Sequence, residues 1–296
     1  MVRSGAILMV GAVGIFVSSS LFYAISAGPR AVPLPLVASE SQLAAMTQLA
    51  VPGLPSAAMV PVAGRLDLYN PFLRPDNLML WSLLIAVWFA LILHAVTVLR
   101  QQHRFERAGA VAVVNALPGM PDTGPPTAQE IAARHRHDNR PSEHAPLALA
   151  LVLGAIWPWI IHQHQAVGFV MALAMLSLAL AAAIRGQRDG PAIRRRQTVG
   201  FFGGWATAVT YAAFASLLNN YLGIPAIAAT VTAMLLCASA GVITQLRLGG
   251  VFSYSVAVIW SLVGLALVTM SADATIAMVA IIGISAMAIV LVRAAS

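Results

Sequence analysis

The sequence predicts an all-α fold, a polytopic transmembrane helical bundle of about eight spans, and two observations lead to that prediction. Of the 296 residues, 59% are apolar and only 9% are charged, whereas an average soluble domain has about 45–50% and about 25%. The apolar residues also form runs of about twenty, the length that a helix needs to cross a bilayer. Together these observations exclude a soluble globular domain.

Eight runs are long enough to span the membrane. In chain order they cover residues 5–27, 78–99, 145–162, 166–184, 198–218, 224–245, 251–270 and 273–293. The chain therefore divides into a first transmembrane helix (1–27), a loop (28–77), a second helix (78–99), another loop (100–144) and a six-helix transmembrane region (145–296).

The first run has two interpretations. Arg3 gives it a short positive start, and residues 24–27 (Ala-Ile-Ser-Ala) offer small side chains for cleavage, as in a signal peptide. Its apolar stretch is longer than the about 7–15 residues that are usual in such a peptide. This length favours an uncleaved helix, and both interpretations leave the other seven spans in the same orientation.

The two loops differ in composition. Residues 28–77 are rich in Pro, Ala and Ser, and end near the run 68–72 (Leu-Tyr-Asn-Pro-Phe), whose aromatic rings suit the membrane interface. Residues 100–144 contain the helix-breaking run 118–121 (Pro-Gly-Met-Pro). Thr127 to His137 is predicted to form a short helix in this second loop, with Thr127 as its cap and Glu130 three residues later.

Arginine placement gives the orientation. All seventeen basic residues are arginine, and alternating spans place fourteen of them on one side and three, Arg30, Arg65 and Arg74, on the other. Because basic residues near span ends stay in the cytoplasm, both termini and the loop 100–144 are predicted to be cytoplasmic. Loop 28–77 is then extracytoplasmic. The all-arginine composition fits a high-GC bacterial genome, and the expected location is the inner membrane of a bacterium. The net charge of +7 comes from arginines at the ends of the spans. Nucleic acid is not an expected partner, because binding it needs a solvated basic face.

Groups that could carry chemistry are scarce inside the spans. No Asp, Glu, Arg or Lys lies within a span, the single cysteine, Cys237, has no partner for a disulfide or a metal site, and no known catalytic motif is present. We therefore expect no enzyme activity, no catalytic residue and no metal site. His94 is a titratable residue that lies well inside a span. It either binds a ligand or, as we favour, forms a hydrogen bond with a neighbouring helix or extends toward the interface. His162 and His164 flank Gln163, but no third metal ligand accompanies them.

Aromatic and small residues form the clearest patterns. Tryptophans occur at 81, 88, 157, 159, 205 and 260, and each serves either as a ligand contact or as a packing and interface residue. Within 198–218 a small-residue stripe lets another helix approach closely: it consists of Gly204, Ala208, Ala212 and Ser216. A neighbouring stripe presents hydroxyl groups and aromatic faces to a cavity: Thr207, Tyr211 and Phe214.

These residues resemble part of a known family. The run 155–158 (Ala-Ile-Trp-Pro) near the end of one apolar helix, followed by Trp205 in a later one, resembles the TspO/MBR proteins, the tryptophan-rich sensory or translocator proteins. Residues 70–88, with Trp81 and Trp88, look like the entry to that family's second helix. The run 255–264 looks like a late-helix signature of a longer, eight-span branch. Gly154 stands where the family's third-helix pattern has asparagine.

The resemblance implies a TspO-like core with additional helices, whose cavity binds a porphyrin, haem or another flat hydrophobic ligand, with a role in transport, sensing or regulation. The ligand-binding residues predicted on this basis are Trp81, His94, Trp157, Trp205 and Tyr211. Burial of apolar surface and ring stacking would supply the affinity. Two alternatives stay open: a structural or assembly subunit of a respiratory or photosynthetic membrane complex, and a passive carrier of lipophilic metabolites. The expected partners are the lipid bilayer, a hydrophobic small molecule, and further copies or a larger membrane complex.

Overall fold

The structure is a computed structural model that describes residues 4–26, 66–115, 141–188, 193–269 and 274–295. Its helices are α1 (Ser4–Ile25), α3 (Asn70–Leu73), α4 (Leu78–Asn115), α6 (Pro141–Ile161), α7 (Gln165–Arg188), α8 (Ile193–Leu222), α9 (Ala226–Leu248), α10 (Phe252–Thr269) and α11 (Ala274–Ala295). The predicted all-α helical bundle is confirmed. Most of the predicted loop 28–77, and the predicted helix from Thr127 to His137, lie outside the described residues.

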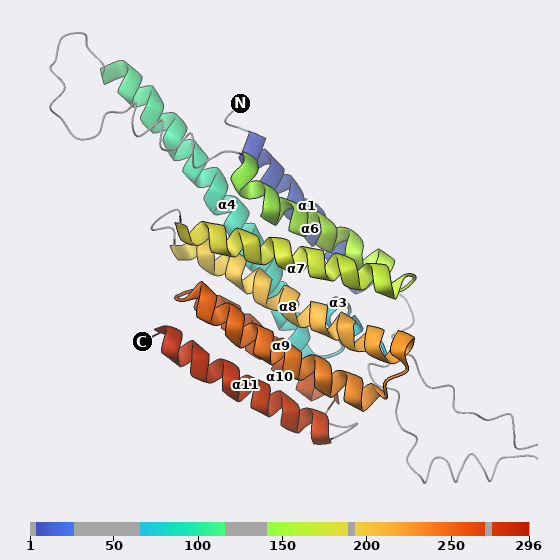
Figure 1. Cartoon of the computed structure of the whole chain (residues 1–296). Helices are drawn as coiled ribbons and strands as arrows, with labels where there is room; N and C mark the ends of the chain where they lie inside the picture. Colours follow the sequence, from blue (N-terminus) through green and yellow to red (C-terminus); the bar gives the residue numbers. More distant parts are fainter. Residues whose placement is uncertain (1–3, 27–65, 116–140, 189–192, 270–273, 296) are drawn as a thin grey trace, which may run out of the picture.

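In the described part of the chain, eight helices are long and apolar enough to cross a membrane. They match the eight predicted spans within a few residues at each end, because the runs of apolar residues that set the prediction are also the segments that form helices. The chain is therefore a multi-pass membrane protein. The span 78–99 is confirmed, but the helix continues beyond it: the first part of the predicted loop 100–144 is helical as far as Asn115. The predicted interval begins with good helix formers such as Gln, Arg and Ala, and Figure 1 shows this part of α4 projecting beyond the other helices.

Consecutive long helices run in alternating directions (Figure 1), and each packs against the next, except that α4 does not pack closely against α6. α8 is the central helix, since it contacts α4, α7, α9 and α10. Of its most apolar window, 83% is buried, compared with 28% for the peripheral α11. α8 therefore lies inside the bundle, whereas most side chains of α11 face outward.

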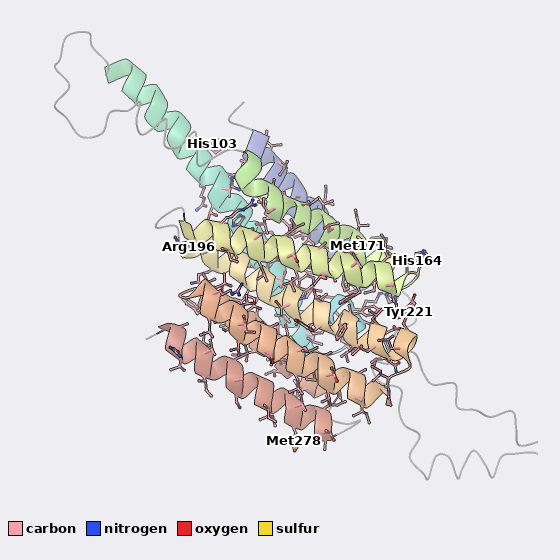
Figure 2. All side chains as sticks on the ribbon, in the orientation of Figure 1. His103, His164, Met171, Arg196, Tyr221 and Met278 are labelled. Atoms are coloured by element: carbon pink, nitrogen blue, oxygen red, sulfur yellow. The ribbon has the colours of Figure 1, made fainter. Side chains whose placement is uncertain are left out.

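The alternation creates two different ends. The end that contains α3, the α6–α7 turn and the α8–α9 turn is called the α3 end. The end that contains Arg196 of α8 and Arg247 of α9 is called the arginine end. Figure 2 shows the separation, because Arg196 lies at one end of the bundle and both His164 and Tyr221 lie at the other.

The bundle exposes apolar side chains and buries several polar ones. Large apolar residues such as Phe89, Val170 and Met278 are more than half exposed, as expected where lipid replaces water. Inside, hydroxyl groups join the helices: Ser19 donates to the carbonyl of Ala155 over 2.6 Å, and Thr210 donates to that of Ala172 over 3.1 Å. In hydrocarbon, such bonds between helices are worth about 1 kcal/mol each.

The small-residue stripe of α8 does allow a close approach. A Cβ atom at Gly204 would lie 2.8 Å from the Cβ of Ala257 on α10, and it would also collide with the carbonyl oxygen of Tyr254. The hydroxyl groups of Thr207 and Tyr254 are 2.9 Å apart at the same contact. Glycine at 204 is therefore required for α8 and α10 to pack at this distance.

Candidate functional site

The five predicted ligand-binding residues do not converge on one cavity. His94 is buried on α4, and its Nδ1 atom lies 3.1 Å from the hydroxyl oxygen of Thr198 on α8. This contact agrees with the favoured interpretation of His94, a hydrogen bond between neighbouring helices. Trp81 is half-buried near the start of α4 and lines neither of the two hollows described below.

Trp157 and Trp205 are buried at two different interfaces. The indole N–H of Trp157 donates to the carbonyl of Gly168 on α7 over 2.8 Å, so this residue joins α6 to α7. Trp205 packs edge-on against Phe16 of α1, with ring centroids 5.9 Å apart. Its Nε1 atom has no hydrogen-bond partner among the described residues. Both side chains pack between helices, which is the second of the two roles predicted for the tryptophans.

Tyr211 is the predicted residue that faces a hollow. This space, called the α8–α10 hollow, lies between α8, α9 and α10, and side chains before and within α3 close its α3 end. Its lining residues are Leu68, Phe72, Ala208, Tyr211, Ala212, Ala233, Met234, Cys237, Ser261, Leu262 and Leu265. The predicted stripe is therefore divided: Tyr211 reaches the hollow, Thr207 bonds Tyr254, and Phe214 packs against Phe169.

The α8–α10 hollow is small because its walls meet closely. Its volume of about 10 Å³ is enough for roughly one water molecule, whereas pockets for drug-sized ligands measure about 300–1,000 Å³. Alanines at 208, 212 and 233 leave room that larger side chains would fill. A larger ligand could enter this space only if the helices or the residues over its end moved.

The residues that close the hollow form a cap, defined here as Leu66 to Leu73. Asn220 of α8 holds its first residue twice: Leu66 N–H donates to Oδ1 over 3.1 Å, and Nδ2 donates to the carbonyl of Leu66 over 3.0 Å. The N–H of Leu68 donates to the hydroxyl oxygen of Ser216 over 3.1 Å. These bonds place the side chains of Leu68 and Phe72 over the hollow.

A polar cluster continues from the cap into the bundle. The carboxylate of Asp67, a residue only 8% exposed, accepts a hydrogen bond from the hydroxyl of Tyr69 over 3.2 Å and one from Gln165 Nε2 over 3.3 Å. Gln165 Oε1 in turn accepts a bond from Asn220 over 3.0 Å. Tyr69 also lies 3.4 Å from His162 Nδ1. Burying a carboxylate without hydrogen-bond partners costs free energy, and these bonds offset that cost for Asp67.

His162 and Arg74 connect this cluster to α1. Nε2 of His162 is hydrogen-bonded to the hydroxyl group of Tyr23. Arg74 donates to the carbonyl of Tyr23 over 3.2 Å and to the hydroxyl of Ser26 over 2.8 Å, and its guanidinium lies 4.5 Å from the centre of the Tyr23 ring. The end of α1, the cap, α7 and α8 thus share one set of polar contacts.

The described residues contain no group of three or more His, Cys, Asp or Glu side chains placed to hold a metal. His162 contacts two tyrosines, while His164 is exposed at the turn after α6 (Figure 2). The cluster offers donors and acceptors that can hold the cap or bind a polar group of a ligand.

Sequence reasoning missed this cluster because it searched for charges inside the spans. Asp67 lies before the second span, and Gln165 and Asn220 lie at span ends, so each looked like an ordinary loop or boundary residue. The available signal was a set of amides, Gln165, Asn219 and Asn220, at span ends that alternation puts on one side.

Comparison of the chain with protein-family models, with curated proteins and with solved structures finds no match. The resemblance to the TspO/MBR proteins therefore stays a prediction that rests on the quoted motifs.

Proposed function

We propose that this integral membrane protein binds a hydrophobic ligand in the α8–α10 hollow, beneath the cap. The observation that carries the proposal is the construction of the hollow: small side chains on two helices leave space beside Tyr211, and Leu68 and Phe72 close its end. A tetrapyrrole is the ligand that the resemblance to the TspO/MBR proteins suggests, and sensing, regulation or transport are the roles it suggests.

The small volume of the hollow sets a condition on binding. A ligand larger than water must displace the cap or separate α8, α9 and α10. The cap is the element best suited to move, because it contains a helix of only four residues and is attached to α8 by side-chain hydrogen bonds.

A fluorescence titration tests the proposal. The purified protein, reconstituted in lipid nanodiscs, is titrated with protoporphyrin IX while tryptophan emission is recorded. Saturable quenching is expected for the unchanged chain. Ala233→Leu fills the hollow from α9 and should abolish the saturable component.

Ala228→Leu is the matched control, since residue 228 is an exposed alanine on the same helix and the substitution should leave the titration unchanged. Melting temperatures of both variants report whether the fold is retained, because overfilling a packed site costs about 1–3 kcal/mol. Equal quenching in a folded Ala233→Leu variant and in the unchanged chain would place the binding site elsewhere.

One observation favours a second function, a structural or assembly subunit of a larger membrane complex. The interior is filled by apolar side chains, and the hollow measures only about 10 Å³. A subunit of this kind needs no internal ligand. Purification in a mild detergent, with no saturable porphyrin binding but constant co-elution with a respiratory or photosynthetic complex, would support the second function over the first.

A further inference from the structure

A second, larger space lies at the arginine end, where α8 begins and the chain turns from α9 into α10. Its volume is about 460 Å³, and it is called the arginine pocket. Its lining residues include two arginines, a glutamine, two glycines and a phenylalanine: Arg196, Gln197, Arg247, Gly249, Gly250 and Phe252. It is separate from the α8–α10 hollow, with which it shares no lining residue.

The charge of the arginine pocket is positive. Arg196 and Arg247 come from two different helices, and the lining residues that the structure describes include no carboxylate. The pocket also contains Phe252, the first residue of α10, so the positive end of that helix dipole adds to the field. An anion is therefore the complementary ligand.

Hydrogen bonds fix the turn that lines the pocket. Gln197 Nε2 donates to the carbonyl of Gly250 over 3.0 Å, and Gln197 Oε1 accepts from the N–H of Ser253 over 3.0 Å. Gln245 Nε2 donates to the carbonyl of Gly249 over 2.7 Å. Two carbonyl oxygens of the turn are thus engaged by amides of the protein, which reduces the repulsion that an anion would meet.

The glycine pair keeps the pocket open. Gly249 has φ of 55°, a conformation that glycine adopts without strain. A Cβ atom at Gly249 or at Gly250 would meet no heavy atom within 4 Å. Space therefore lies directly over the backbone of the turn, where a ligand can approach it closely.

The pocket lies at the ends of two candidate spans, the level at which lipid headgroups are expected. Arg196 begins the α8 span and Arg247 stands next to the last residue of the α9 span. Apolar surface continues below: Phe252 is 48% exposed, and Ile243, one turn before Arg247 on the same face of α9, is 55% exposed. A molecule with a phosphate group at the arginines could lay an acyl chain along this surface.

We propose that the arginine pocket binds the phosphate group of an anionic amphiphile. Guanidinium groups form paired hydrogen bonds with phosphate oxygens, and basic pockets between transmembrane helices suit anionic lipid headgroups. The phosphate has two sources, an anionic phospholipid from the bilayer or a soluble phosphate compound, and the apolar surface below the arginines favours the lipid.

Native mass spectrometry of the full chain tests the site with two probes. The protein is titrated with phosphatidylglycerol or phosphatidylcholine, and inorganic phosphate is added in a separate series that follows the melting temperature. The test variant is Arg196→Gln/Arg247→Gln. The matched control is Arg293→Gln, which removes one arginine at the end of α11, outside the pocket.

The lipid source predicts that phosphatidylglycerol binds more tightly than phosphatidylcholine, that the double variant weakens phosphatidylglycerol about tenfold or more, and that the control does not. The soluble source predicts no preference between lipids but a rise in melting temperature with inorganic phosphate, lost in the double variant. Both results support a phosphate site. Equal binding of the two lipids with no effect of phosphate, or an equal loss in the control, overturns it.

Discussion

The two ends of the bundle are both held by amide side chains, yet one is closed and the other is open. At the α3 end, Asn220 and Gln165 are bonded to the cap and to a buried carboxylate. At the arginine end, Gln197 and Gln245 hold a turn that borders a space of about 460 Å³. The same kind of side chain is used at both ends, but its neighbours differ. Apolar cap residues lie over the amides at the α3 end, and arginines lie beside them at the arginine end.

This difference has an energetic consequence. A hydrogen bond buried from water and lipid cannot be replaced when one partner is removed, and the unsatisfied group costs about 1–3 kcal/mol. Water can replace a lost bond at an open end. Substitutions at the α3 end should therefore destabilise the protein more than equivalent substitutions at the arginine end.

The largest effect is expected for Asn220→Leu. This change removes both bonds to Leu66 and the bond to Gln165, so we expect a loss of about 2 kcal/mol in the free energy of unfolding. Denaturation of the protein in detergent micelles measures it. Tyr221→Leu is the control, since Tyr221 is 60% exposed at the same end. An equal loss in both variants would mean that the cap does not depend on Asn220.

A smaller effect is expected for Gln197→Ala at the arginine end. It removes two hydrogen bonds, to Gly250 and from Ser253, and the bond to Gly250 is exposed, whereas the three bonds of Asn220 are partly buried. Water that enters the arginine pocket can replace them, and the expected loss is about 1 kcal/mol. The same denaturation experiment compares the two ends directly. If Gln197→Ala costs more than Asn220→Leu, the arginine end is the more tightly held of the two.

The smallest effect is expected for Arg196→Gln/Arg247→Gln. Arg247 is exposed and Arg196 is partly exposed, and substitutions at such positions usually change stability by no more than about 0.5 kcal/mol. Measured without anionic lipid, the melting temperature should stay close to that of the unchanged chain. A large loss would show that the arginines hold the fold, and the comparison of lipid binding would then need the single variants.

The span pattern could be predicted from the sequence because it depends on composition over about twenty residues. The close helix contact at Gly204 could also be predicted, because small residues at helical spacing allow another helix to approach. The polar cluster was not visible. Its members Asp67, Gln165 and Asn220 are far apart in the sequence, and only the folding of the cap onto α8 brings them together.

The predicted ligand-binding residues show the same limit. Tryptophan and histidine signal that a helix face has a special partner, but that partner can be a neighbouring helix. Trp157 forms a hydrogen bond with Gly168, and His94 lies within hydrogen-bond distance of Thr198. Of the five residues, Tyr211 is the one that lines the α8–α10 hollow. Periodicity indicates which residues share a face, and it does not indicate what that face meets.

Cys237 gives the most direct test of whether a hydrophobic ligand binds beneath the cap. It is the single cysteine of the chain, it is only 3% exposed, and it lines the α8–α10 hollow. The measurement is the rate at which a membrane-permeant maleimide labels this thiol in nanodiscs, with and without protoporphyrin IX.

We expect slow labelling of the unchanged chain, faster labelling when Asn220→Leu loosens the cap, and clear protection by a saturating ligand in both. An unchanged labelling rate at protoporphyrin concentrations that saturate the fluorescence signal would contradict the claim, because the ligand would then be bound away from the hollow.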